Sequence, residues 1–225
     1  MLKEGIIMII NLKGLEDFKF NMNSSAYAYV KEGTLYFKGN VSFEKVMIAL
    51  AYHSFGNKCW YCGKVFSKNV KRTVDHKYPL IYGGVTILDN LVPCCSYCNE
   101  EKSNLTEQQY KDWKLLNTTE REEFRYRSIG KNEKRRILEG TILPKSWFER
   151  KSSTILAPIN FDAIICGKKH DNAKRFYWRT GKLENPVIIS RNGIILDGFI
   201  SAFLGKELGI KKIPTIRLEN VVVEC

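Results

Sequence analysis

The sequence contains no apolar run long enough to cross a membrane, because a spanning helix needs about 20 apolar residues. The apolar segment near the N-terminus, Ile6–Ile10, is followed at once by Asn11 and is also too short for an export signal. Internal repeats and low-complexity tracts are absent, and a hydrophobic share of 44% excludes wholesale disorder. We therefore expect one or two globular domains in a reducing, cytoplasmic compartment.

Acidic residues are scarce: 24 Asp and Glu face 36 Lys and Arg, which gives a net charge of +12. This excess favours a polyanionic partner, because neutralising phosphates releases condensed counterions. Residues 58–77 and 168–182 concentrate the charge, and Phe176, Tyr177 and Trp178 interrupt the second stretch. These aromatic side chains either stack on bases or lie in the core beneath a solvated face. We expect nucleic-acid contacts from Lys58, Lys71, Arg72, Lys77, Lys174, Arg175 and Arg179.

Histidine is also rare, with three residues, whereas cysteine occurs seven times. Four cysteines form two Cys-x-x-Cys pairs, Cys59 with Cys62 and Cys95 with Cys98, which 32 residues separate. Four thiolates complete the tetrahedron of a structural zinc site, which is a more frequent use of such pairs in reducing compartments than a disulfide. Cys94 is an alternative to Cys95, but the two-residue gap to Cys98 favours Cys95. The non-functional alternative is a set of free, buried cysteines.

Apolar periodicity and turn residues predict a mixed fold. Strands are expected at Ile6–Ile10, Tyr27–Val30, Thr34–Phe37, 186–189, 193–196 and Pro214–Leu218. Helices are expected from Phe43 to about Phe55, from Thr106 through Leu116, from Thr119 onward, separately at Lys131–Glu139, and at Phe199–Leu208. The charged segment Glu149–Ser153 is the expected linker.

The residues between and after the cysteine pairs form one ordered motif. It reads Asp75-His76, Pro79, Gly83-Gly84, then Asn90-Leu91-Val92-Pro93, and finally Cys95-x-x-Cys98-Asn99 with Lys102. Here the chain closely resembles the HNH endonuclease family, in its subgroup with a four-cysteine zinc site. Ser103 is a departure, because the family often has glycine after the lysine, and we expect it to alter the first turn of the helix of this motif and to leave the chemistry intact.

The resemblance implies a ββα-metal fold, with a hairpin that carries Asp75 and His76 and a helix that starts near Asn99. By that likeness His76 is the general base, Asp75 and Asn99 bind a catalytic Mg²⁺ or Mn²⁺, Asn90 stabilises the loop and Lys102 lies near the phosphate. The chemistry is sound in itself, because a neutral imidazole can take a proton from water and a hard cation can compensate phosphate charge. A structural Asp-His turn is the alternative. His53, for packing or capping, and His170, in a basic loop, are weaker candidates.

The C-terminal segments Asn185–Ile189, Ile195–Gly198 and Gly205–Pro214 resemble the ParB/sulfiredoxin-like domain. In that family, charged residues that hold nucleotide phosphates follow the Asp-Gly pair. Phe199, Ile200 and Ser201 occupy those places here, and isoleucine cannot replace a guanidinium. We therefore expect a degenerate unit that recognises DNA, positions the nuclease or mediates assembly, or a purely structural appendage.

Taken together, the sequence predicts an α+β protein with three parts. These are a β-rich extension at residues 1–40, a ββα-metal nuclease core with flanking helices at residues 41–150, and a small α/β domain at residues 151–225. The expected function is hydrolysis of phosphodiester bonds in nucleic acid, double-stranded DNA first, by a bacterial or phage-encoded enzyme. The alternatives are an RNA-directed nuclease and an inactive zinc-containing module that only binds nucleic acid.

Overall fold

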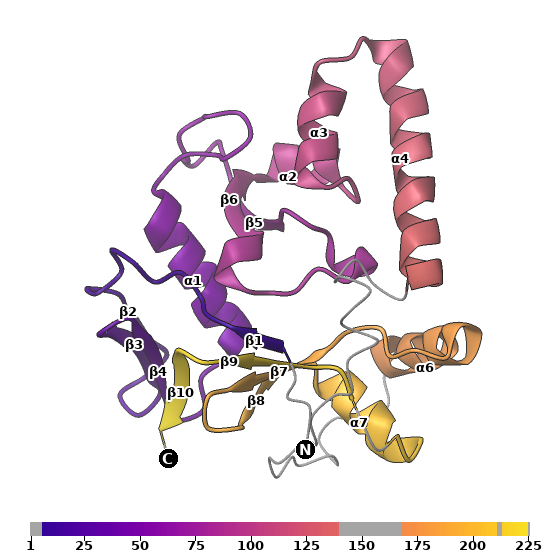
Figure 1. Ribbon diagram of the computed structural model, residues 1–225. Coiled ribbons are helices and arrows are strands. Elements are labelled where there is room, and N and C mark those ends of the chain that lie inside the picture. The colour runs from indigo at the N-terminus through magenta and orange to yellow at the C-terminus, as the bar shows by residue number, and fades with distance from the viewer. Residues whose placement is uncertain (1–5, 140–167, 211–212, 225) are drawn as a thin grey trace. The chain divides into compact units, whose positions relative to one another are not determined.

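The structure, a computed structural model, describes residues 6–139, 168–210 and 213–224 (Figure 1). The chain divides into two compact units. Met1–Val46 and Leu143–Cys225 form the first, here called the sheet unit, and Met47–Ile142 form the second, here called the cysteine unit. The boundary falls inside helix α1 (Phe43–Phe55), whose bounds agree with the sequence prediction. The expected linker at residues 149–153 lies outside the described residues.

One sheet of the sheet unit has the strand order β1-β9-β7-β8. Its strands are β1 (Ile6–Met8), β9 (Thr215–Leu218), β7 (Val187–Ser190) and β8 (Ile195–Asp197). All of β7 is buried, as expected for an apolar run at the centre of a sheet. Helices α6 (Lys168–Thr180) and α7 (Phe199–Glu207) contribute Ala173, Ala202 and Leu204 to the same apolar cluster.

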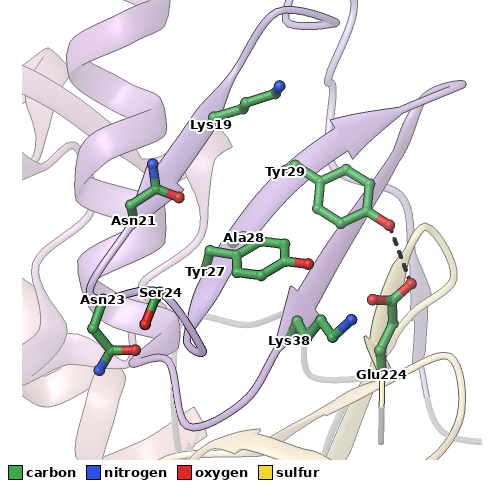
Figure 2. A pocket seen from close by; sticks show the side chains of 9 residues that line it. All are labelled: Lys19, Asn21, Asn23, Ser24, Tyr27, Ala28, Tyr29, Lys38 and Glu224. Atoms are coloured by element: carbon green, nitrogen blue, oxygen red, sulfur yellow. Dashed lines mark hydrogen bonds between the residues drawn. The ribbon is translucent and has the colours of Figure 1, made fainter.

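The other sheet has the order β10-β4-β3-β2. Its strands are β2 (Lys19–Asn21), β3 (Tyr27–Lys31), β4 (Thr34–Lys38) and β10 (Val221–Glu224). Side chains alternate along β3, with Ala28 and Val30 buried and the tyrosines between them half-exposed, as the period of two requires. Figure 2 shows that the half-exposed face of this sheet lines an open pocket.

Strands from the first forty residues pair with strands near the C-terminus. Strand β1 pairs in parallel with β9, and β4 pairs in parallel with β10, so both N-terminal pairings reach across the sequence. Asn220 reinforces the arrangement, because its amide donates to the Ile10 and Gly33 carbonyls and its oxygen accepts from the Ile10 N–H. The short runs at the two ends of the chain need each other to complete their sheets.

The cysteine unit contains a ββα arrangement. Strands β5 (Arg72–His76) and β6 (Leu91–Cys95) form an antiparallel hairpin, and helix α2 (Ser96–Lys102) follows β6 directly. The expected helix therefore begins three residues before Asn99, because the Cys95 sulfur accepts the N–H of Cys98 at its N-cap. Two short 3₁₀ helices, η1 (Leu80–Tyr82) and η2 (Leu88–Asn90), lie in the connection of the hairpin.

The helices after α2 differ in part from the prediction. Helix α3 (Glu107–Lys114) begins after Thr106, as expected, and Thr106 forms a capping box with Gln109. Helix α4 (Thr118–Glu139) is continuous, so the separate helix expected from Lys131 is wrong, and Gly130 lies inside it. Its cap is Asn117, which exchanges hydrogen bonds with Glu120, so the helix begins one residue before the expected start at Thr119. No helix in the described part of the chain is long and apolar enough to cross a membrane.

Candidate functional site

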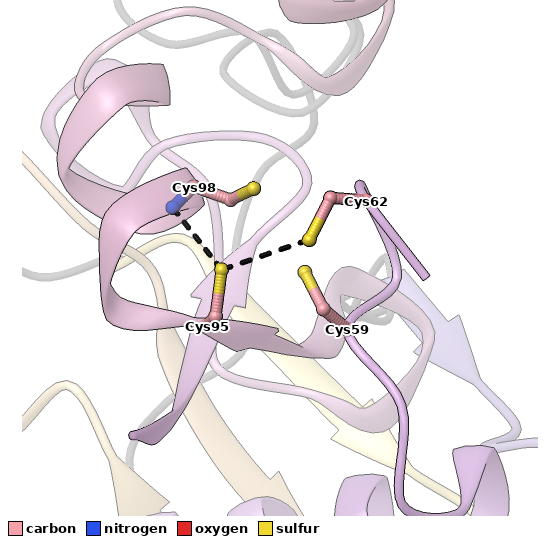
Figure 3. Close-up of side chains that lie close together, drawn as sticks. All are labelled: Cys59, Cys62, Cys95 and Cys98. Carbon is pink, nitrogen blue, oxygen red and sulfur yellow. Dashed lines mark hydrogen bonds between the residues drawn. The ribbon is translucent and has the colours of Figure 1, made fainter. Parts of the chain in front are cut away.

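The four expected metal ligands meet at one point of the cysteine unit (Figure 3). The sulfur atoms of Cys59, Cys62, Cys95 and Cys98 all lie within 4.8 Å of one another. Cys95 and Cys98 come from the junction of β6 and α2, and the other two from the turn before β5. Four thiols at this spacing can form the closed tetrahedral site of a structural zinc ion.

The thiols of the cluster differ in acidity, because burial raises the pKa of Cys95 and of Cys98, whereas the pKa of Cys59 is lowered. Burial raises the pKa of the Cys59 thiol, but N–H groups of Cys95 and Cys62 outweigh this effect and bring the pKa down to about 7. A thiolate is the form that binds zinc. Burial also raises the pKa of Cys94, to about 12, and its sulfur lies 3.3 Å from the Thr73 hydroxyl, outside the cluster. The geometry therefore favours Cys95 over Cys94 as the fourth ligand.

Asp75 lies on β5, 6% exposed, within a buried polar network. Its carboxylate accepts a hydrogen bond from the Tyr61 hydroxyl at 2.5 Å and forms an ion pair with Lys102 at 2.9 Å. Burial raises the pKa of Asp75, and the Lys102 ammonium opposes this rise. Burial raises the pKa of Tyr61 well above its ordinary value, so the hydroxyl stays protonated. It can therefore donate the hydrogen bond to Asp75. The network fixes the carboxylate at the edge of the hairpin.

Lys102, which the resemblance would place near a phosphate, lies at the end of α2. Its side chain is fully buried, and its ammonium donates to the Asp75 carboxylate and to the carbonyl of His76 at 2.9 Å. The lysine therefore joins the last turn of α2 to the end of β5. Its contacts hold the Asp75 carboxylate and the main chain at His76.

His76 ends strand β5 with its ring half-buried. The Nε2 atom lies 3.1 Å from the hydroxyl of Thr86, which is itself buried. Burial, with a contribution from the charge of Lys102, lowers the pKa of His76 to about 4. The imidazole is therefore neutral at neutral pH, which is the form that accepts a proton.

Asn90 and the glycine pair shape the loop between the strands. The Asn90 side chain accepts from the Tyr78 N–H and donates to the Tyr78 and Val85 carbonyls, so it closes the loop beside His76. Gly83 has a φ of 95°, which favours glycine. A Cβ atom on Gly84 would lie 2.1 Å from the carbonyl oxygen of Tyr78, so a side chain cannot fit there.

Asn99 lies on α2 beside the Asp75 strand. Its amide nitrogen donates to the Val74 carbonyl and the Thr73 hydroxyl, both at 3.3 Å, which leaves the Oδ1 atom as the candidate donor to a metal ion. Ser103 ends the same helix with a φ of 49° and a ψ of −123°. The expectation that Ser103 alters the first turn is therefore wrong: it occupies the C-cap, in a conformation that favours glycine.

The expected nucleic-acid contacts fall on both units. In the cysteine unit, Lys58, Lys71 and Arg72 are exposed, Lys77 is half-buried, and Arg72 stacks on Tyr52 at 3.8 Å. In the sheet unit, Arg175 and Arg179 are exposed on α6, whereas Lys174 is half-buried and pairs with Glu207. Of the aromatic side chains on α6, Phe176 is in the core and Trp178 is 67% exposed.

His170 is buried in α6 and bonds to Glu207, so its expected place in a loop is wrong. His53 lies in the last turn of α1.

Two residues that contact the motif were not expected from the sequence. Tyr61 lies inside the first cysteine pair and bonds to Asp75, and Thr86 follows the glycine pair and bonds to His76. The position of a tyrosine between two cysteines does not by itself predict a contact with Asp75. The second position has a weak signal, because a threonine in a loop beside a proposed base is a ready hydrogen-bond partner.

Residues 59–105 match the family model of the HNH endonuclease. The match contains the hairpin, helix α2 and the cysteine cluster, and the four cysteines are positioned to bind a metal. Members of this family are usually nucleases, so the match supports a hydrolase that acts on nucleic acid at the coarse level. No curated protein and no solved structure matches the chain, so the ParB/sulfiredoxin-like resemblance of the C-terminal residues has no support from these comparisons.

Proposed function

We propose that the chain is a metal-dependent endonuclease that hydrolyses phosphodiester bonds of DNA, with double-stranded DNA as its first substrate. One observation carries the proposal: the cysteine cluster and Asp75-His76 lie in one ββα arrangement, inside the region that matches the HNH endonuclease model. Binding alone does not need a neutral histidine next to a fixed carboxylate.

His76 is the proposed general base. Its low pKa, about 4, keeps the ring neutral at neutral pH, and Thr86 limits its rotation. A positioned base contributes roughly 10²–10⁴ in rate. In this role the ring removes the proton of the attacking water, and the hydrogen bonds that Asn90 makes to the loop keep the ring at the end of β5.

Asp75 and the Oδ1 atom of Asn99 are the proposed ligands of Mg²⁺ or Mn²⁺. One carboxylate and one amide oxygen form a hard donor set that suits these ions. When bound, such an ion compensates the charge that develops on the phosphate. The residues contribute position: Tyr61 and Lys102 hold Asp75, and the Asn99 amide bonds to the neighbouring Val74 carbonyl.

Basic side chains around the hairpin supply the proposed contacts to the substrate. Lys58, Lys71 and Arg72 are exposed in the cysteine unit, and Lys77 follows His76 directly. Contacts of this kind bind phosphates and carry no base sequence. They therefore support binding of a polynucleotide of any sequence, with the α6 residues Lys174, Arg175 and Arg179 as a second set.

One feature favours the alternative of an inactive binding module: Lys102 and Tyr61 already bond to both carboxylate oxygens of Asp75.

Conversion of supercoiled plasmid by the zinc-loaded protein, with Mg²⁺, Mn²⁺ or neither, distinguishes the nuclease from the inactive binding module. We expect cleavage that needs the added ion and that falls about 10²–10⁴-fold in His76→Ala. Lys45→Gln is the control, because this exposed lysine lies outside the matched region.

The same assay with labelled RNA tests the alternative that the protein is an RNA-directed nuclease. Wild-type protein that binds plasmid without cleaving DNA or RNA under any ion would refute the nuclease and leave the binding module. Cleavage that persists in His76→Ala would refute the proposed base.

A further inference from the structure

The sheet unit carries a face of tyrosine and lysine side chains that the proposed catalytic site does not use. Cross-strand register and alternation bring Tyr27 and Tyr29 of β3 and Tyr36 of β4 to the half-exposed face of the β10-β4-β3-β2 sheet. The buried side chains of the same strands, such as Ala28 and Leu35, form the opposite face. We call the first face the tyrosine face.

The rings on this face lie close together. Tyr29 and Tyr36 stack with ring centres 5.1 Å apart and planes 13° apart, and Tyr27 lies 6.1 Å from Tyr29. The Tyr29 hydroxyl bonds to Glu224 on β10, which fixes the orientation of that ring (Figure 2). Three partly exposed, ordered rings on adjacent strands are an aromatic surface of the kind on which nucleobases stack.

The charges around the rings are complementary to a nucleic-acid backbone. Lys19 on β2, Lys31 on β3 and Lys38 on β4 are exposed on the same face, and the Lys38 ammonium lies 5.9 Å from the centre of the Tyr27 ring. Glu224 is the acid among the residues that line the pocket, and its carboxylate is bonded to Tyr29. Figure 2 shows Tyr27, Tyr29 and Lys38 projecting from the sheet into this open pocket.

We propose that the tyrosine face binds unpaired nucleotides of a DNA or RNA strand, through base stacking on Tyr27, Tyr29 and Tyr36 and phosphate contacts to Lys19 and Lys38. Paired bases cannot stack on protein rings without leaving the duplex, so we expect the tyrosine face to bind single strands more tightly than duplexes. This role rests on the proposed nuclease function for its purpose, because it adds a site for an unpaired strand to an enzyme whose proposed substrate is double-stranded DNA. The binding itself does not depend on cleavage.

Fluorescence anisotropy of the full-length, zinc-loaded His76→Ala protein tests the proposal without cutting the probe. The probes are labelled oligothymidylate, the matching oligouridylate and a DNA duplex, with no added Mg²⁺ or Mn²⁺. In a Tyr27→Ala/Tyr36→Ala background, we expect affinity for the single strands to fall by about tenfold or more, since stacking contributes roughly that much per base. Affinity for the duplex should not change.

The controls separate ring, charge and folding. Tyr27→Phe/Tyr36→Phe keeps both rings and should bind within about twofold of the parent, since stacking needs only the aromatic face. Lys38→Gln should lower the slope of log affinity against log salt by about 0.7, as expected for one phosphate contact to a single strand. Lys13→Gln, an exposed lysine of the same unit outside the face, should leave the slope unchanged.

Photocrosslinking of wild-type protein to bromouridine-substituted oligonucleotide needs no variant, and we expect the crosslinked peptides to contain β3 or β4. Equal affinity of the double alanine variant and its parent, or crosslinks confined to other segments, would overturn the tyrosine face. An equal loss for duplex and single strand would do the same. If the protein cleaves plasmid but fails these tests, only the tyrosine face is refuted. If it binds single strands there but never cleaves, only the nuclease is refuted.

Discussion

The two units of this chain are stabilised in different ways. The sheet unit buries aliphatic side chains between sheet and helices, with Val187, Ala202 and Leu204 in one cluster. The corresponding cluster of the cysteine unit is built around Cys59, Cys94, Cys95 and Cys98, with Tyr110 and Trp113 beside them. We therefore expect a metal ion held by these cysteines to add to the stability of the second unit, beside its apolar burial. The candidate nuclease site lies in the same unit as this cysteine cluster.

Loss of the metal should break this comparison most strongly. In small zinc-dependent folds, the binding of structural zinc contributes roughly 10–16 kcal/mol of apparent free energy to folding. In Cys95→Ala we expect zinc content to fall and hydrogen exchange to become fast in β5, β6 and α2, while β7 and β9 stay protected. Cys94→Ala is the matched control, because Cys94 is buried outside the sulfur cluster, and it should keep one zinc ion per chain. Loss of zinc in Cys94→Ala alone would show that the ligand set is misassigned.

The buried ion pair gives the next largest effect. Lys102→Met leaves the Asp75 carboxylate buried without its cation, which typically costs about 3–5 kcal/mol. The double variant Asp75→Asn/Lys102→Met should recover much of that loss, because no charge then remains in the network. Urea denaturation of both variants, with the zinc content verified, measures the difference. Equal stability of wild type and Lys102→Met would mean that the pair is solvated in solution.

A cavity in the sheet unit tests the opposite half of the comparison. Ile216 on β9 is fully buried between β1 and β7, so Ile216→Ala should cost about 2–5 kcal/mol. Zinc content and exchange protection in β5 and β6 should not change. Ile7→Ala is the control from the same sheet, because this side chain is 52% exposed, and its cost should be small. Coupled loss of zinc in Ile216→Ala would show that the units fold together.

The comparison also explains how far the sequence leads. Local patterns gave the bounds of α1 and the start of α3 after Thr106, and the family resemblance gave the hairpin that carries Asp75 and His76. The cysteine spacing gave four sulfur atoms that meet in space. These features are local or are fixed by ligand chemistry, which leaves a strong signature in a single sequence.

Long-range pairing was beyond the sequence. Nothing local indicates that β4 pairs with β10 or that β1 pairs with β9, because short strands carry no information about distant partners. The buried position of Lys102 was equally hidden, since a lysine at the end of a helix ordinarily reaches solvent and this one meets Asp75 only in the folded unit. The continuous α4 shows that one glycine, Gly130, does not end a helix.

Protonation of His76 gives a pH-dependent difference between the units. The pKa of His76 in the folded protein is about 4, whereas the pKa of a histidine in an unfolded chain is about 6.5. As the pH falls through this window the unfolded chain binds the proton first, so the stability of the cysteine unit should decline from about pH 6.5 towards pH 4. NMR titration of the imidazole resonance that disappears in His76→Ala measures the folded pKa. A midpoint near 6.5 would contradict the buried environment of the ring.

The smallest expected effect is a gain in stability at Ser103. Its φ of 49° with ψ of −123° lies where a side chain is strained, and glycine relieves strain of that kind. Ser103→Gly should therefore stabilise the cysteine unit by about 1 kcal/mol, the lower end of what such a conformation costs. Ser67→Gly, at an exposed turn of the same unit, should not stabilise, because the added chain entropy of glycine has no strain to offset it. The gain should be measurable as a shift of the urea midpoint of the cysteine unit, whereas zinc binding and the stability of the sheet unit should not change.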